Sequence, residues 1–82
     1  MKIGKLEFEA IWKKRGEFFK KDSKPNLTLT IHPSLWREIE IYVNSQQNMI
    51  QYRFELEKLS IFGIPVVLNS QIEGSIMTNE NR

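Results

Sequence analysis

The sequence predicts a single small α+β domain, with two helices packed on a mostly antiparallel sheet of three to four strands. Its 82 residues leave room for one domain. Its composition, 40% hydrophobic and 27% charged, is that of a globular chain. Apolar residues recur with the period of a helix in two segments and with the period of a strand in others. We expect residues 1–77 to form the domain and residues 78–82 to be a disordered tail, because the tail has nothing to bury.

A first helix is predicted over Leu6–Lys21, because its larger apolar residues share one helical face, which we expect to be buried. Gly16 lies inside this helix and costs about 1 kcal/mol relative to alanine. The stretch from Leu6 to Ala10 also alternates apolar and charged residues, so a strand followed by a helix is the alternative. The apolar residues of the predicted face are Phe8, Ile11, Trp12, Phe18 and Phe19.

A turn, a short strand and a second helix are predicted next. The turn is Asp22–Asn26, which collects turn formers and a proline. Leucine and isoleucine alternate with threonine in Leu27–Ile31, as in a half-buried strand. The second helix starts at Pro33, in the position where a missing N–H is tolerated, and His32 is its N-cap or a loop residue. It ends in the polar segment Asn44–Asn48. Its apolar stripe consists of Leu35, Trp36, Ile39, Tyr42 and Val43.

The remaining predicted elements are strands. Apolar and polar residues alternate over Ile50–Glu57, which predicts a strand with one wet face. Leu59–Ser70 is the most apolar window of the chain and is rich in β-branched residues, which predicts a third strand. Gly63 and Pro65 bend this strand and move it to an edge, because proline donates no ladder hydrogen bond. A loop and a last short strand, Ser75–Met77, follow.

Composition limits the environment and the chemistry of the chain. It contains no cysteine, so disulfides and thiolate zinc sites are excluded. No apolar stretch approaches the roughly 20 residues of a membrane span, and the N-terminus lacks the apolar core of a signal peptide. We therefore expect a cytoplasmic protein with no membrane partner.

The sequence predicts no catalytic site. His32 is the only histidine, and the glutamates at 7 and 9, 38 and 40, and 55 and 57 are spaced as solvated surface residues. Motifs for a nucleophile elbow or a phosphate-binding loop are missing from the sequence. We expect no enzyme activity, no cofactor, no metal site and no small-molecule substrate.

A protein-binding edge is the first candidate site. The proline in the apolar strand argues against a central position, so a partner strand could add beside it. Ile41 falls off the stripe of the second helix and is a further contact candidate. The residues of this predicted site are Gly63, Ile64, Pro65, Val66, Val67 and Ile41.

A basic helix is the alternative site. Residues 1–24 hold eight lysines or arginines against four acids, and aromatic residues lie among them. Such a helix would contact nucleic-acid phosphates and stack on bases, although burial of the aromatic residues in the core is the interpretation we prefer. The candidate phosphate contacts are Lys13, Lys14, Arg15, Lys20 and Lys21.

The second half of the chain carries a family resemblance. A strand leads into a helix that starts H-P-x-x-W, and a G-x-P-V-V strand and a loop closing on glycine follow. The matching residues are His32, Pro33, Trp36, Gly63, Pro65, Val66, Val67 and Gly74. Residues 30–76 thus resemble a segment of the HK97-fold major capsid proteins of tailed bacteriophages. The chain is too short for the spine helix and extended arm of a shell subunit.

The resemblance implies a small phage or prophage protein. We expect it to act through protein–protein contacts, including self-association, either as a virion component or as a binder of a host protein. A nucleic-acid-binding module that uses the basic N-terminal helix is the alternative function.

Overall fold

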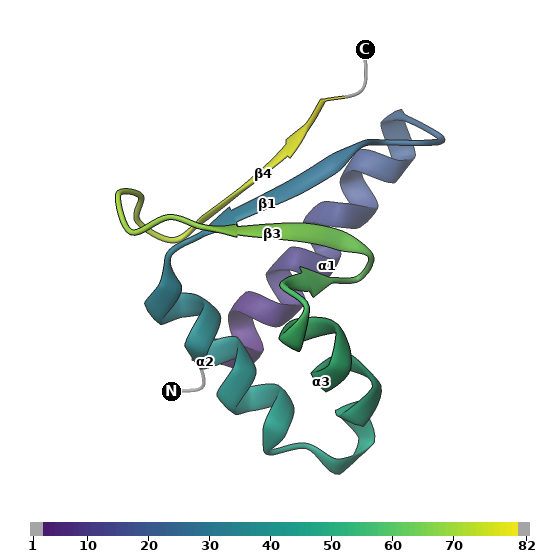
Figure 1. Ribbon diagram of the computed structural model, residues 1–82. Coiled ribbons are helices and arrows are strands. Elements are labelled where there is room, and N and C mark those ends of the chain that lie inside the picture. The colour runs from purple at the N-terminus through teal and green to yellow at the C-terminus, as the bar shows by residue number, and fades with distance from the viewer. Residues whose placement is uncertain (1–2, 81–82) are drawn as a thin grey trace.

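The computed structural model describes residues 3–80, which form three α-helices, one short 3-10 helix and a four-stranded sheet (Figure 1). The predicted α+β class is confirmed. In chain order the elements are α1 (Ile3–Lys21), β1 (Leu27–Ile31), α2 (Pro33–Asn44), η1 (Gln47–Met49), α3 (Ile50–Glu57), β2 (Ser60–Ile61), β3 (Ile64–Leu68) and β4 (Ser75–Asn79).

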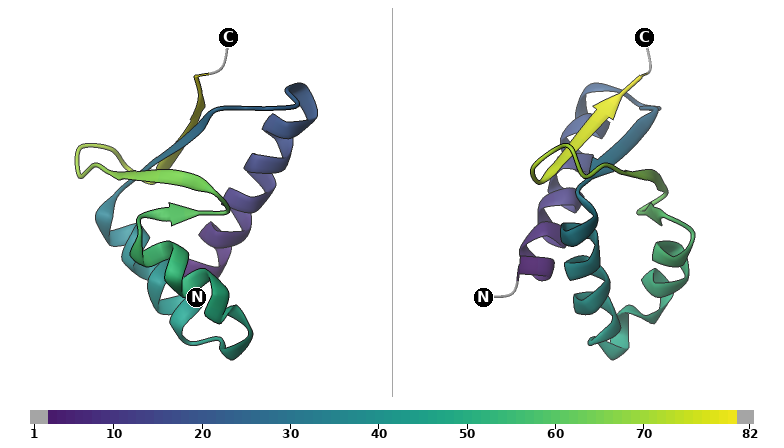
Figure 2. Two further views of the ribbon diagram at one scale, coloured as in Figure 1. Left: turned by 45° about the vertical axis from the view of Figure 1, so that its right-hand side comes forward. Right: turned by 60° about the vertical axis from the view of Figure 1, so that its left-hand side comes forward.

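The strands are ordered β2-β3-β1-β4. The pairs β2–β3 and β1–β4 are antiparallel, and β1–β3 is parallel, so the sheet is mixed but mostly antiparallel, as predicted. A parallel pair needs a crossover connection, and here α2, η1 and α3 supply it. In Figure 1, α1 lies behind the sheet while α2 and α3 lie below it. The views in Figure 2 show α2 beside α1 and α3 returning along α2 to reach β2.

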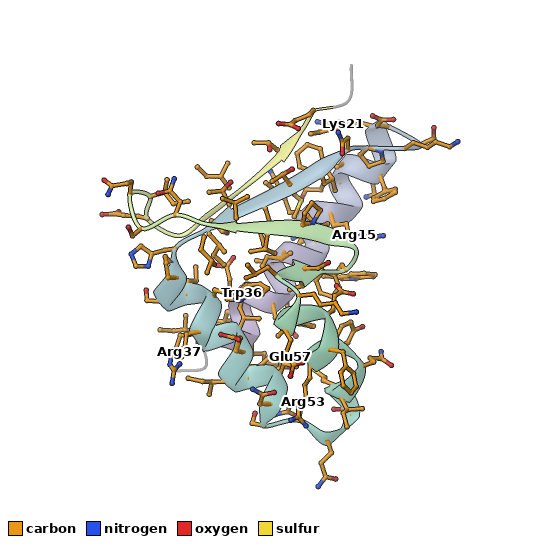
Figure 3. All side chains as sticks on the ribbon, viewed as in Figure 1. Arg15, Lys21, Trp36, Arg37, Arg53 and Glu57 are labelled. Carbon is orange, nitrogen blue, oxygen red and sulfur yellow. The ribbon has the colours of Figure 1, made fainter. Side chains whose placement is uncertain are left out.

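The core lies between the sheet and the helices. Leu29 and Ile31 of β1 are buried together with Ile39 and Val43 of α2 and Ile61 of β2. Predicted burial is thereby confirmed for β1 and for the centre of the α2 stripe. Trp36 belongs to the same cluster and lies inside the molecule (Figure 3).

The start of α2 follows the sequence prediction. His32 is the N-cap, and its Nδ1 accepts a hydrogen bond from the backbone N–H of Ser34 at 3.1 Å. Pro33 occupies the first turn, where its missing N–H leaves no helical hydrogen bond unmade. Close approach of α1 to α2 depends on Gly4, since a Cβ at that position would overlap the backbone carbonyl of Glu38.

The prediction of a strand over Ile50–Glu57 is wrong, because this segment forms α3. Its alternating pattern also fits a helix, since residues four apart share a helical face. Tyr52 and Leu56 pack against the core, whereas Ile50 and Phe54 are 55% and 64% exposed. The segment is also rich in good helix formers.

The predicted edge strand is a hairpin whose second strand lies inside the sheet. The turn at Phe62 and Gly63 joins β2 to β3, and β3 then pairs with β1. Pro65 is tolerated because β3 pairs with β1 only from Val66 onward, and Val66 N–H donates to the carbonyl of Leu59 on the β2 side. In the strand order β3 lies between β2 and β1, but Ile64 and Pro65 pair with β2 alone and Val66–Leu68 pair with β1 alone.

The preferred prediction of a single first helix is confirmed, whereas its buried face and the C-terminus depart from prediction. Residues Ile3–Lys21 form one helix, so the alternative of a strand followed by a helix is wrong. Trp12 and Phe19, which we expected to be buried, are 56% and 42% exposed. The predicted disordered tail is wrong for Thr78 and Asn79, which belong to β4 and pair with β1. Residues 81–82 of that predicted tail lie outside the described residues.

Candidate functional site

An aromatic cluster on the surface joins α1, α3 and the hairpin turn. The ring of Phe62 is at its centre, with ring centroids 5.0 Å from Phe8, 5.0 Å from Trp12 and 5.7 Å from Tyr52. Phe8 and Tyr52 also meet, at 5.4 Å. All four pairs are edge-to-face, the arrangement that aromatic quadrupoles favour. We call Phe8, Trp12, Tyr52 and Phe62, with Arg15, the aromatic patch.

The turn that carries Phe62 has an uncommon backbone conformation. Phe62 and Gly63 have φ values of 54° and 78°, the positive values that a two-residue hairpin turn requires. A positive φ at a residue other than glycine costs about 1–3 kcal/mol and persists only where surrounding contacts hold it. Here the Phe62 carbonyl accepts from Nε of Arg15 at 3.2 Å, and the Gly63 N–H donates to Oε1 of Glu55 at 3.1 Å. The turn is thus fixed from both α1 and α3.

Arg15 is held between two rings on α1. Its guanidinium carbon lies 5.3 Å from the Trp12 centroid and 4.4 Å from the Phe19 centroid. The residues follow at intervals of three and four, which places them on adjacent turns of one helical face. Together with the hydrogen bond to Phe62, this stacking orients the guanidinium at the rim of the patch. Figure 3 shows Arg15 beside the start of β3, directly after the hairpin turn.

A small hollow opens into the patch. It has a volume of about 210 Å³ and is lined by the four rings of the patch and by Glu9. Small-molecule sites are usually larger, about 300–1,000 Å³. The hollow therefore suits one apolar side chain better than a whole metabolite.

The predicted protein-binding edge does not form one site. Ile64 and Val66 point into the core, and Gly63 occupies the hairpin turn. Pro65 and Val67 are exposed on the face of the sheet that points away from the helices. Ile41 is exposed as predicted, but it lies on α2 beside a hollow shared with Ile3 and Tyr42 and is not part of the hairpin.

The predicted basic residues are distributed around α1. Lys13 and Lys20 are exposed seven residues apart, so they share one side of the helix. Lys14 pairs with Glu17 at 3.8 Å, and Lys14 and Lys21 line another side together with Glu17 and Phe18. Arg15 is half-buried in the aromatic patch. Figure 3 shows Arg15 and Lys21 at separate places along α1. These five residues therefore form no single basic patch.

The aromatic patch was not predicted from the sequence, because Trp12 and Phe19 were expected in the core. The buried face of α1 is set by Gly4, Phe8 and Ile11, and continuing this spacing leads to Arg15 and Phe18. A usable signal was the consecutive pair of Phe18 and Phe19, since neighbouring helical residues point about 100° apart. Tyr52 was missed because α3 was predicted to be a strand. Phe62 had no local signal, because the rings it meets come from distant segments.

Among residues 3–80, no group of three or more histidine, cysteine, aspartate or glutamate residues is placed to hold a metal ion. Within the same residues, every helix is too short or too polar to cross a membrane.

Comparison of the chain with family models, curated proteins and solved structures finds no match. The resemblance of residues 30–76 to HK97-fold capsid proteins therefore stays a prediction.

Proposed function

We propose that this protein is a non-enzymatic protein-binding module and that the aromatic patch is its contact surface. The observation that carries the proposal is the exposed Trp12, stacked on the guanidinium of Arg15 and packed on Phe62. Tryptophan, tyrosine and arginine are the residues that most often dominate the binding energy of protein interfaces. A rigid, pre-oriented group of these residues loses little conformational entropy when a partner binds.

The chemistry of the patch defines the partner segment. The hollow accepts one aliphatic or aromatic side chain, and its rings supply the apolar walls. The guanidinium of Arg15 places positive charge at its rim, beside Trp12, and Glu9 is the one acid in its lining. A peptide with one large apolar residue flanked by acidic residues complements this surface. We further propose, from the capsid resemblance, that the partner is a phage virion protein or a host protein.

Selection from a random peptide library displayed on a carrier tests the proposal. We expect wild-type protein to enrich peptides with an aromatic residue or leucine next to aspartate or glutamate. Binding of these peptides should fall at least tenfold in Trp12→Ala and in Arg15→Ala. The matched control is Ile50→Ala, which removes an equally exposed apolar side chain outside the patch and should bind normally. Selected peptides that bind all four proteins equally would contradict the proposal.

Nucleic-acid binding is the second candidate, and the exposure of Trp12 beside cationic residues favours it. Bases stack on exposed aromatic rings, and lysine and arginine contact phosphates, so such binding weakens steeply with salt. A fluorescent single-stranded oligonucleotide, titrated at low and moderate salt, discriminates between the two functions. We expect no salt-sensitive binding. Binding that falls with salt and is lost in the double variant Lys13→Glu, Lys20→Glu would replace the protein-binding proposal.

A further inference from the structure

The outer edge of β4 has backbone groups that point away from the sheet. β4 is the terminal strand in the order β2-β3-β1-β4 and pairs with β1 on one side only. His32 N–H donates to the Gly74 carbonyl, and Glu80 N–H donates to the Asn26 carbonyl, so even-numbered residues direct their backbone groups toward β1. Alternation along an antiparallel strand then directs the N–H and C=O groups of Ser75 and Met77 outward.

This edge lacks the usual protection against strand addition. Natural edge strands are shortened, bulged, or interrupted by lysine or proline. β4 keeps a continuous register with β1 over five residues, and its sequence SIMTN contains neither charge nor proline. The sheet face that points away from the helices is uncharged across three strands. Its residues are Thr28, Thr30, Pro65, Val67, Ile76 and Thr78.

A groove runs beneath the same edge. It has a volume of about 190 Å³ and lies between α1 and β4, with Ala10, Ile11 and Met77 among its lining residues. A strand added beside β4 would direct every second side chain to the helix-covered side of the sheet, over this groove. The edge therefore offers both backbone hydrogen-bonding groups and an apolar groove for side chains, the two features that strand addition uses.

Charged residues at the groove select the direction of the added strand. Glu7 lies at the Ser75 end, where its Oε2 accepts from Ser75 Oγ at 2.9 Å. Lys14 lines the same groove two helical turns further along α1. Lys14 therefore lies toward the Asn79 end of β4. This follows because α1 continues from Lys14 toward Asp22, and the side chain of Asn79 donates to Asp22 at 3.4 Å. A two-fold axis near Met77 would exchange the two ends and bring Glu7 of one copy toward Lys14 of the other.

We propose that the β4 edge binds the β4 edge of a second copy of this chain, antiparallel and around a two-fold axis at Met77. The two Met77 residues then exchange backbone hydrogen bonds across the axis, and Ile76 of each copy lies opposite Thr78 of the other. Such an isologous contact closes as a dimer and joins two sheets into one. The surface is separate from the aromatic patch, so loss of the dimer and loss of peptide binding are independent results.

Sedimentation equilibrium over a range of protein concentrations tests the dimer. We expect the mass of wild type to approach that of two chains, and that of Met77→Pro to remain that of one chain. On the backbone, proline at 77 removes an outward N–H alone, so the ladder to β1 is retained, and far-UV circular dichroism should confirm the fold. Met77→Leu keeps the N–H and should dimerise like wild type. A wild type that is monomeric at every concentration, or a folded Met77→Pro that dimerises like Met77→Leu, overturns the proposal.

Two further measurements test the register without depending on the proline variant. Amide hydrogen exchange at Met77 should slow as wild-type concentration rises, while exchange at Ile76 and Thr78 stays unchanged. Glu7→Lys and Lys14→Glu should each weaken self-association, because like charges then meet at the axis-related ends. Mixing these two variants should yield heterodimers that are more stable than either homodimer. Concentration-independent exchange at Met77, or no preference for heterodimers, contradicts the proposed arrangement.

Discussion

Nε of Arg15 on α1 donates to the backbone carbonyl of Phe62, at 3.2 Å, across 47 positions of the sequence. This hydrogen bond ties the longest helix to the hairpin turn and holds a phenylalanine in a conformation with positive φ. The same guanidinium stacks on two exposed rings. One side chain thus fixes the turn and orients the surface that we propose for binding.

Arg15→Lys should weaken the turn without unfolding the domain. Lysine cannot reproduce the planar stacking on Trp12 and Phe19 or the fixed Nε–H that Phe62 accepts. We expect a loss of about 1 kcal/mol in the free energy of unfolding, the usual net value of one hydrogen bond. Urea unfolding measures this loss, and near-ultraviolet circular dichroism should show a changed Trp12 environment. An unchanged near-ultraviolet spectrum would contradict the stacked arrangement.

The two tryptophans should differ in how much their substitution destabilises the protein. Trp36 is 3% exposed, whereas Trp12 is 56% exposed. Trp36→Ala should lower the free energy of unfolding by about 3–5 kcal/mol, as for other large-to-small core changes. Trp12→Ala should lower it much less, while peptide binding is lost. Thermal unfolding of the two variants provides the comparison, and a Trp12→Ala protein that is as unstable as Trp36→Ala would contradict the surface role of Trp12.

Substitution of two glycines of α1 by alanine should change the free energy of unfolding in opposite directions. Gly16→Ala should stabilise the protein by about 0.5–1 kcal/mol, because alanine is the better helix former and its Cβ would meet nothing within 4 Å. Gly4→Ala should destabilise it, since the added Cβ would overlap the Glu38 carbonyl and force α1 away from α2. Urea unfolding of both variants tests this packing. Stabilisation by both substitutions would show that α1 and α2 do not approach closely at Gly4.

The hairpin turn should depend on glycine at position 63. Its φ of 78° strains any residue with a Cβ, and we expect Gly63→Ala to cost about 1–2 kcal/mol. Gly63→Asn should cost less, because asparagine tolerates this conformation. Thermal unfolding of the two variants measures the difference. Equal stability of Gly63→Ala and wild type would exclude the positive φ in solution.

The α+β class, a single N-terminal helix as the preferred interpretation, strand β1 and the start of α2 could all be predicted from the sequence. These features depend on local rules: turn formers around Pro25, alternation in Leu27–Ile31, and the proline and cap residue at the start of α2. Each rule acts over a few neighbouring residues, so the printed sequence contains the required information.

Only the tertiary structure decided the rest. Alternating apolar residues in Ile50–Glu57 fit both a strand and a helix, and in the helix that forms Tyr52 and Leu56 pack together against the core. The close contact at Gly4 decides which side of α1 faces α2, and the exposure of Trp12 depends on that orientation. Phe62 meets Trp12 and Tyr52 only after three distant segments pack together. The candidate site was hidden from sequence analysis because non-local packing brings its residues together.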